Sequence, residues 1–428
     1  MAGGGRWLGV AVGSWLVGGA AFGCSGTNLT GDAGDVPPNP ADTVGNPCST
    51  DTECDDGEPC NGVETCSPET GRCIGGAQVV DFTQCTTSDG RYASCVDGRC
   101  DLDYEEMLVP AGPFVMGADP DEDTGCDWPA ADAWPERIVE LSGYFIDRYE
   151  VTNKRYQRCQ SRSGCPSFHR DGSFLRHEYF SDPAYSDFPL IYVDRRRAAE
   201  YCAYEGKRLP TEAEWEKAAR GGCEVVPPET CGDEDERDLP WDSPPFGEYE
   251  DRLTCERANY GSYVGYRDER CPDDTSRVGL RPAGRSPYGV DDMIGNVREI
   301  VGDCIARYVD CPGGCVDPWG SCEGWADPLD AAIAVRGGSW QYTCDFLVHR
   351  AFQRGEDMGN LEGFRCVRPA AGLKAARMPA SSSASGGTEG EGTDEGRSSR
   401  AAGASRIAGV GLGMHLAGGG NRVLPRHP

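Results

Sequence analysis

Residues 206–216 read Gly-Lys-Arg-Leu-Pro-Thr-Glu-Ala-Glu-Trp-Glu. Thr211 precedes Glu214 by three positions, which is the spacing of a capping box. In that motif each of the two side chains accepts a hydrogen bond from the backbone N–H of the other residue. The stretch therefore predicts a helix that opens at Thr211, continues through Trp215 and stops at the glycine pair 221–222.

A second helix is expected just before this stretch, from about residue 195 to residue 204. Asp194 is a favoured N-cap residue, and Gly206 lies near the expected end. Residues 139–146 alternate in part between apolar and polar side chains and predict a strand. Most of the remaining sequence from residue 103 onward is rich in Gly, Pro and Asp, which favours a long, loop-rich α+β domain.

The composition bounds the function. The chain has 428 residues, of which 38% are hydrophobic, and a formal net charge of −29. A field of that sign repels phosphate backbones, so we expect no nucleic-acid partner. A Gly-x-Ser-x-Gly elbow and a His-Glu-x-x-His zinc helix are both absent from the sequence, which argues against the hydrolases that use them.

Cysteine usage indicates an oxidising compartment. The chain has 23 cysteines and no Cys-x-x-Cys pair of the kind that structural zinc sites favour. Cytosolic thiols stay reduced, so this number of cysteines predicts a disulfide framework in an exported protein. Eight cysteines lie from Cys48 to Cys100 and 14 from Cys126 to Cys366, and both even counts suit closed sets of disulfides.

The N-terminus has the features of an export signal. Arg6 precedes an apolar, small-residue stretch at 7–22 that is too short and too rich in glycine for a good membrane span. Small residues before Cys24 resemble a bacterial lipoprotein signal, so residues 1–23 are expected to be removed and Cys24 to carry the lipid. The alternative is an ordinary secretory signal that leaves one spare thiol. We therefore expect an outer-membrane or cell-surface lipoprotein, or alternatively a secreted or periplasmic protein.

The chain divides into five parts by composition. The predicted parts are a signal peptide at 1–23, a flexible tether at 24–47, a Cys-rich module at 48–102, a main domain at 103–371 and a disordered tail at 372–428. The Cys-rich module has little core to bury, so we expect disulfides to hold it together.

Six strings within residues 104–370 resemble the formylglycine-generating enzyme, or sulfatase-modifying factor, family. They occur in the order and at roughly the spacing of that family. The resemblance implies an elaborated C-type-lectin-like α+β fold with little regular secondary structure. The strings are VPAGPFVMG at 109–117, FIDRYEVTN at 145–153, GKRLPTEAEWE at 206–216, DMIGNVRE at 292–299, RGGSW at 336–340 and GFRCVR at 363–368.

The catalytic cysteine pair of the family is missing. Oxidase members bind copper through cysteines at the third and eighth positions after the serine of their Gly-Gly-Ser motif, and two close thiolates suit Cu(I). After Ser339, these positions are Tyr342 and Leu347, so we do not expect copper. The alternative is a displaced site at Cys344 and His349. If it is absent, Cys344 belongs to a disulfide and His349 is an ordinary packing or surface residue.

The resemblance also implies one disulfide, between Cys202 in the expected second helix and Cys366 in the Gly-Phe-Arg-Cys string. Short separations favour two local pairs of this chain's own, Cys159 with Cys165 and Cys223 with Cys231. The cysteines at 304, 311, 315, 322 and 344 cannot be paired from sequence.

Calcium is the cofactor that the resemblance implies. One family site corresponds to side-chain oxygens of Asp292 and Glu299 and backbone carbonyls of Gly295 and Val297. Hard oxygen ligands on a tight loop are what Ca²⁺ requires. The alternative is a structural turn in which Glu299 forms an ion pair with an arginine.

A second family calcium site would begin at Asn259 and Tyr260. Its later ligands would lie near Asp273 and Asp274, where the loop departs from the family pattern. Both calcium sites would stabilise loops rather than take part in chemistry.

Two classes of function follow. The first is a non-catalytic binding or scaffold lipoprotein, with a groove near Ser339, Trp340 and Arg350 for a secreted or surface protein or peptide, and with membrane attachment through Cys24. The second is a formylglycine-generating-type oxidase, or another protein-modifying enzyme of the family, with a displaced site. The missing copper pair favours the first.

Overall fold

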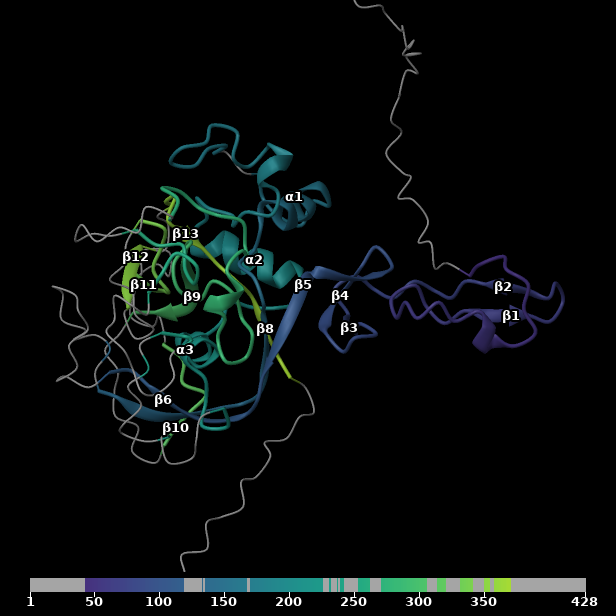
Figure 1. Cartoon of the computed structure of the whole chain (residues 1–428), viewed down its shortest axis with the longest axis horizontal. Helices are drawn as coiled ribbons and strands as arrows, with labels where there is room; N and C mark the ends of the chain where they lie inside the picture. Colours follow the sequence, from purple (N-terminus) through teal and green to yellow (C-terminus); the bar gives the residue numbers. More distant parts are fainter. Residues whose placement is uncertain are drawn as a thin grey trace, which may run out of the picture. The chain divides into compact units, whose positions relative to one another are not determined.

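The computed structural model describes part of the chain as an α+β arrangement of four small sheets and short helices (Figure 1). All of the described residues belong to one compact unit within residues 1–376. They are residues 43–118, 133, 135–167, 170–225, 231, 237, 239–241, 253–261, 271–305, 314–320, 332–341, 350–354 and 358–370.

The first eight cysteines after Cys24 form a closed disulfide set, which is the even set that their count predicts. Regular structure in its first half consists of short elements: the 3₁₀ helix η1 (Asp51–Glu53) and the antiparallel strands β1 (Thr65–Ser67) and β2 (Arg72–Ile74). With so little regular structure, cross-links replace much of the missing core. The four disulfides are Cys48–Cys66, Cys54–Cys73, Cys60–Cys95 and Cys85–Cys100.

A five-stranded sheet in the order β14-β8-β5-β4-β3 joins this Cys-rich region to the main domain. Its longest strand, β5, crosses the position 102–103 where the two predicted parts meet, so the chain enters the main domain along a continuous strand. The strands are β3 (Gln84–Thr86), β4 (Tyr92–Val96), β5 (Arg99–Val109), β8 (Tyr144–Asp147) and β14 (Val367–Pro369).

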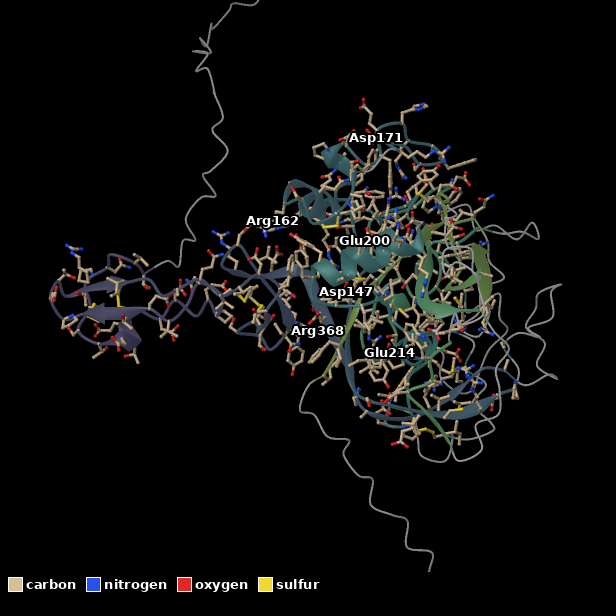
Figure 2. All side chains as sticks on the ribbon, turned by 180° about the vertical axis from the view of Figure 1, so that it is seen from behind. Asp147, Arg162, Asp171, Glu200, Glu214 and Arg368 are labelled. Carbon is tan, nitrogen blue, oxygen red and sulfur yellow. A yellow bond between two sulfur atoms is a disulfide. The ribbon has the colours of Figure 1, made fainter. Side chains whose placement is uncertain are left out.

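Two arginines of the main domain reinforce this junction; both are labelled in Figure 2. Arg162 pairs with Asp81, which precedes β3, and with Asp97, which follows β4. Arg368 of β14 pairs with Glu106 of β5 and donates to the carbonyl of Phe82 in the Cys-rich region at 3.4 Å. These contacts show that the second half of the Cys-rich region packs as part of the main domain.

A smaller sheet corrects one prediction. Residues 139–146 do not form a single strand: β7 (Arg137–Leu141) ends before residues 142–143, and β8 begins after them. β7 lies between β6 (Gly112–Met116) and β10 (Cys315–Val316), whereas β8 belongs to the five-stranded sheet. The periodicity could not show the break because the apolar pattern resumes directly after it.

The third large sheet has the order β12-β11-β9-β13. β9 is central: it pairs antiparallel with β11 and parallel with β13. The strands are β9 (Arg298–Cys304), β11 (Ala332–Arg336), β12 (Ala351–Arg354) and β13 (Glu362–Gly363).

Both predicted helices are present. α2 (Arg195–Tyr204) is capped by Asp194, and α3 (Glu212–Arg220) opens with the complete Thr211–Glu214 capping box. A third helix, α1 (Asn153–Ser161), was not predicted; the Thr152 side chain caps it by accepting from the backbone of Arg155. Two further 3₁₀ helices in the described part of the chain are η2 (Pro183–Tyr185) and η4 (Pro282–Gly284). Within the described part of the chain, no helix is long and apolar enough to cross a bilayer.

The disulfide Cys202–Cys366, which the resemblance implied, joins α2 to the segment before β14, with Cα atoms 5.6 Å apart. The expected local pairs Cys159–Cys165 and Cys223–Cys231 are also bonded, and Cys255 pairs with Cys271. Cys304 and Cys315 are each part of a disulfide as well. Cys344 lies outside the described residues.

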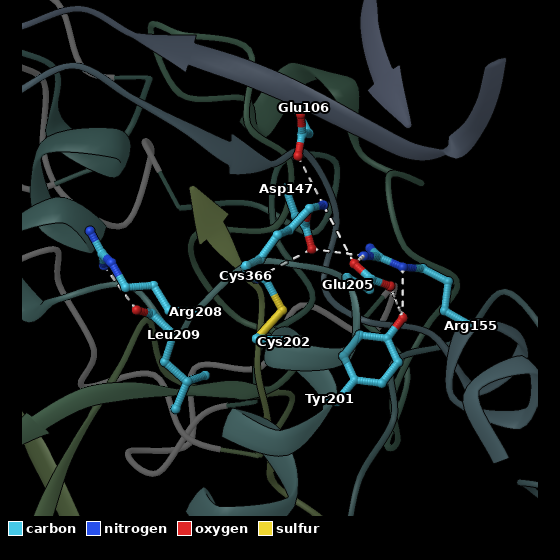
Figure 3. Close-up of a disulfide and its surroundings, with 10 residues drawn as sticks. Glu106, Asp147, Arg155, Tyr201, Cys202, Glu205, Arg208, Leu209 and Cys366 are labelled. Atoms are coloured by element: carbon cyan, nitrogen blue, oxygen red, sulfur yellow. Dashed lines mark hydrogen bonds and ion pairs between the residues drawn. A yellow bond between two sulfur atoms is a disulfide. The ribbon is translucent and has the colours of Figure 1, made fainter. Parts of the chain in front are cut away.

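A buried charge network lies beside the Cys202–Cys366 bond (Figure 3). Lys207 Nζ lies 2.6 Å from Asp147 and 2.9 Å from Glu106, and Arg155 bridges Asp147 at 2.9 Å and Glu205 at 2.6 Å. Burial alone would lower the pKa of Lys207, but the surrounding carboxylates raise it above its ordinary value. Lys207 and Arg155 therefore each lie against two carboxyl groups from other segments of the chain.

Replacement of Lys207 by methionine should destabilise the fold strongly, because Asp147 and Glu205 would then share Arg155, and Glu106 would keep only its pair with Arg368. Removal of one member of a buried ion network costs about 3–5 kcal/mol. Urea unfolding with the disulfides intact measures the change. Lys154→Met, which removes a half-exposed lysine paired with Asp103, is the matched control and should cost less than about 1 kcal/mol. Equal losses for the two variants would contradict the role given to Lys207.

Candidate functional site

The segment around Arg336-Gly-Gly-Ser-Trp, the N-terminal turn of α3 and Arg350 form one cluster. α3 places Glu212 and Glu216 four residues apart and therefore on the same face. Arg336, at the end of β11, lies 2.9 Å from Glu212 and 2.6 Å from Glu216. Arg350 makes a two-point contact with Glu212, in which its Nη2 lies 2.7 Å from Oε2.

Glu212 is ionised at this position. Burial raises its pKa, but the charges of Arg350 and Arg336 outweigh that effect and lower the pKa below the ordinary value. The two arginines are thus held by carboxylates of the same chain. Arg336 and Arg350 therefore fix the positions of the surrounding segments, and neither is placed to take part in proton transfer.

Ser339 and Trp340 are packed rather than presented to solvent. Ser339 is fully buried, and Trp340 is 3% exposed. Trp340 donates from its backbone N–H to the carbonyl of Asn296 at 2.9 Å, and its ring centroid lies 5.3 Å from that of Phe174. Phe174 is 61% exposed, so it extends the buried indole toward the surface. Cys344 and His349, the candidates for a displaced metal site, lie outside the described residues.

Gly337 allows the strand to turn tightly here. Its φ is +85°, and a Cβ would lie 2.7 Å from the carbonyl oxygen of Met293 and 2.9 Å from the Trp215 ring. Only glycine adopts this conformation readily and fits the space. The turn brings Ser339 and Trp340 next to the loop that precedes β9.

Glu299, one of the expected calcium ligands, pairs with an arginine. Its two oxygens accept from Arg365 at 2.6 and 2.7 Å, and Oε2 also accepts from the Trp215 indole N–H at 2.9 Å. A carboxylate has about four lone-pair sites, so three are already used. Glu299 therefore fits the role of an anchor for Arg365 better than the role of a cation ligand.

The other expected ligands of this calcium site lie close to a group of buried carboxyl groups in the core. Asp292 has a φ of +58° and accepts from the backbone of Gly279 at 2.6 Å. Burial raises the pKa of Asp292 to about 6. Glu150, which sequence reasoning missed, is fully buried, and burial followed by the charges of Asp292 and Glu299 raises its pKa well above normal. Gly295 and Val297 lie in the same turn, next to Glu150, to which Val297 donates its N–H at 3.3 Å.

Asn259 offers a clearer fit to a cation. It is fully buried, and its amide nitrogen donates to the Asp274 carbonyl at 3.0 Å and to Asn296 at 3.2 Å. Its Oδ1 is buried without a hydrogen-bond partner in the structure. A buried carbonyl oxygen of that kind is costly unless something accepts its lone pairs, and a hard cation does so. The neighbouring Tyr260 donates its hydroxyl to the Leu253 carbonyl at 2.9 Å, so this hydroxyl is not directed at a cation beside Asn259.

Sequence reasoning placed Ser339, Trp340 and Arg350 together but missed the carboxylate partners of Arg336 and Arg350. Glu212 and Glu216 were visible only as helix residues. Their spacing of four, on a helix with a buried tryptophan between them, is the signal that could have marked them as buried acids. Their arginine partners lie more than 100 residues away and could not be assigned.

The family of the sulfatase-modifying factor enzyme 1-like domain matches residues 95–370 of the chain. An uncharacterised Bacillus subtilis protein, YfmG, is 34% identical over 203 residues, which cover 45% of this chain and 40% of that protein. A cattle protein named inactive C-alpha-formylglycine-generating enzyme 2 is 28% identical over 311 residues, covering 61% of this chain and 87% of that protein. The chain spans less than half the length of the first curated relatives that it matches.

Among solved structures, the chain is similar to PvdO from Pseudomonas aeruginosa. The TM-score is 0.47 and the sequence identity 24%, and the match covers 68% of this chain and 99% of that one.

Proposed function

The chain belongs to the family of the sulfatase-modifying factor enzyme 1-like domain, and we propose that it is an exported binding or scaffold member without the oxidase chemistry. The observation that carries the proposal is the pair of residues at the copper positions, Tyr342 and Leu347. A phenol and an alkyl chain cannot replace two thiolates around Cu(I). The similarity to a cattle protein named inactive C-alpha-formylglycine-generating enzyme 2 is consistent with this proposal.

The described part of the site supports binding over chemistry. Arg336 and Arg350 are paired with Glu212 and Glu216, and Ser339 is buried, so these groups serve to hold the structure together. Beside them, Phe174 and Leu175 are each 61% exposed. Neighbouring exposed apolar side chains commonly mark a surface that a partner covers. The partner class that fits is a secreted or surface protein, or a peptide from one.

Export and membrane attachment complete the proposal. The disulfides require an oxidising compartment, and a lipid on Cys24 would hold the chain at an outer membrane or cell surface. Cys24 lies outside the described residues, so this part rests on the sequence. A secreted or periplasmic form is the alternative.

Copper chemistry tests the proposal. The purified chain, loaded with Cu(I) and supplied with a thiol reductant, should neither retain stoichiometric copper nor consume oxygen above a buffer control, because no thiolate pair is placed to bind the metal. Copper retention is measured by metal analysis after desalting and oxygen with an electrode.

Stoichiometric copper with thiol-dependent oxygen uptake would contradict the proposal. If Cys344→Ser then removed both signals and the double variant Cys159→Ser/Cys165→Ser kept them, the displaced-site oxidase would take its place. The double variant controls for the loss of a local disulfide elsewhere in the chain.

We further propose that calcium stabilises the loop at Asn259 rather than catalysing. Asn259 would supply its Oδ1, Tyr260 would supply its backbone carbonyl, and Asp273 would complete the charge. The Asp274 carboxylate already pairs with Arg176 at 3.0 Å, so it is the weaker candidate of the two aspartates. The ion would satisfy a buried acceptor that the protein leaves open. Asp292, with Gly295, Val297 and Glu299, forms the second possible set, although Glu299 is largely committed to Arg365.

Calcium should raise the thermal midpoint of the chain, by an amount that corresponds to about 2.7 kcal/mol at a hundredfold excess over the dissociation constant. Asn259→Ala should remove this shift, and Asn259→Asp should keep it, because a carboxylate also supplies an oxygen. Scanning calorimetry with calcium or with chelator measures both variants. An unchanged shift in Asn259→Ala would contradict the assignment.

The pH dependence separates the two ligand sets. The pKa of Asp292 is about 6 in the folded chain and above its ordinary value, so this carboxylate takes up a proton as the pH falls through 6. A site built on Asp292 would therefore show a smaller calcium shift at pH 5 than at pH 7. A site built on the neutral amide of Asn259 would retain more of it.

A further inference from the structure

A pocket of about 410 Å³ opens on a face of the chain that the proposed function does not use. It lies where the turn between β7 and β8, the start of α3 and the loop after β10 meet. Its polar and aromatic lining includes Ser142, Arg208, Glu214, Asp317 and Trp319. A concave site with a few convergent polar groups is the usual form of a small-molecule site.

The polar groups of the pocket are fixed in place. Asp317 adopts a left-handed backbone, with a φ of +43°, and its two oxygens accept from the backbone N–H of Ser142 at 2.7 Å and from its hydroxyl at 2.8 Å. Arg208 makes a two-point contact with Glu214, at 2.6 and 2.7 Å. Each polar side chain of the pocket is thus positioned by a hydrogen-bonding partner, which is the kind of preorganisation that favours ligand binding.

Trp319 forms an aromatic wall of the pocket. The residue is 52% exposed, so part of its indole ring is open to a ligand. Its ring tip packs on Gly302 of β9, where an added Cβ would lie 2.9 Å from Cη2. The loop is also tied down by the next residue, Gly320, whose N–H donates to Asp303 at 2.5 Å. The ring is therefore held at one edge and exposed elsewhere.

We propose that this pocket binds a neutral carbohydrate through one pyranose ring. The apolar C–H face of the sugar would stack on Trp319, and its hydroxyls would both donate to and accept from the Asp317 and Arg208 pairs. Hydroxyls suit these groups because each carboxylate already has a partner and keeps spare lone pairs. Two carboxylates face one guanidinium, which disfavours phosphate, sulfate and uronate ligands. The inference stands independently of the proposed function.

Saturation-transfer NMR on the intact chain tests the pocket, with the methyl pyranosides of glucose, galactose, mannose and N-acetylglucosamine as probes. At least one should receive saturation from the protein. Trp319→Ala should weaken its binding about tenfold or more, which is about 1.4 kcal/mol. Gly302→Ala, which pushes the indole aside but keeps it, should also weaken binding. Val316→Ala is the control, since Val316 is 63% exposed on the adjacent strand and does not line the pocket.

Three results would overturn the proposal. One is saturation of none of the four pyranosides, and another is equal saturation in the wild type and Trp319→Ala. The third is binding of N-acetyl-arginine amide in place of the sugars, because a cation on the indole and the two carboxylates would then explain the pocket. Unchanged circular dichroism of each variant confirms that the comparison is between folded chains.

Discussion

The buried ion network around Lys207 is the constraint on which the rest of the structure depends. Lys207 follows α2 and reaches Asp147 at the end of β8, Glu106 in β5 and Glu205 at the end of α2. Arg155 brings α1 into the same network. A charge in a low-dielectric interior is costly unless it is paired, so the network couples the stability of these four elements. The Cys202–Cys366 bond beside them fixes the same junction covalently.

The same design recurs at the candidate site. Arg336, Arg350 and Arg365 are all buried, and each lies against one or more glutamates from a distant segment. A domain with short strands and long loops has few ladder hydrogen bonds to define its register. Pairs of buried opposite charges fix the register of the segments instead, because a shift by one residue would leave a buried charge unpaired. This arrangement also explains why the polar residues there are structural, which supports a binding role over a catalytic one.

The sequence predicted what is local or shared with the family. The Thr211–Glu214 box and the Asp194 cap fixed two helices because capping depends on residues three apart. The fold class and the Cys202–Cys366 pair followed from the family resemblance. The break at residues 142–143 was missed because a strand that changes sheets keeps its apolar pattern. The pairing of Glu299 with Arg365 appeared only as an alternative, and the partners of Arg336 did not appear, since ion pairs across 66 and 120 residues leave no local pattern. The orphaned oxygen of Asn259 is visible only in three dimensions.

The central claim is that this chain holds the family fold without a reactive thiol at its site. Peptide mapping after alkylation under denaturing, non-reducing conditions tests it most directly. The account predicts that Cys344 stays unlabelled because it is bridged to another cysteine. Alkylation of Cys344 in the otherwise fully bridged protein would reveal a free thiol five residues from Ser339 and would contradict the account.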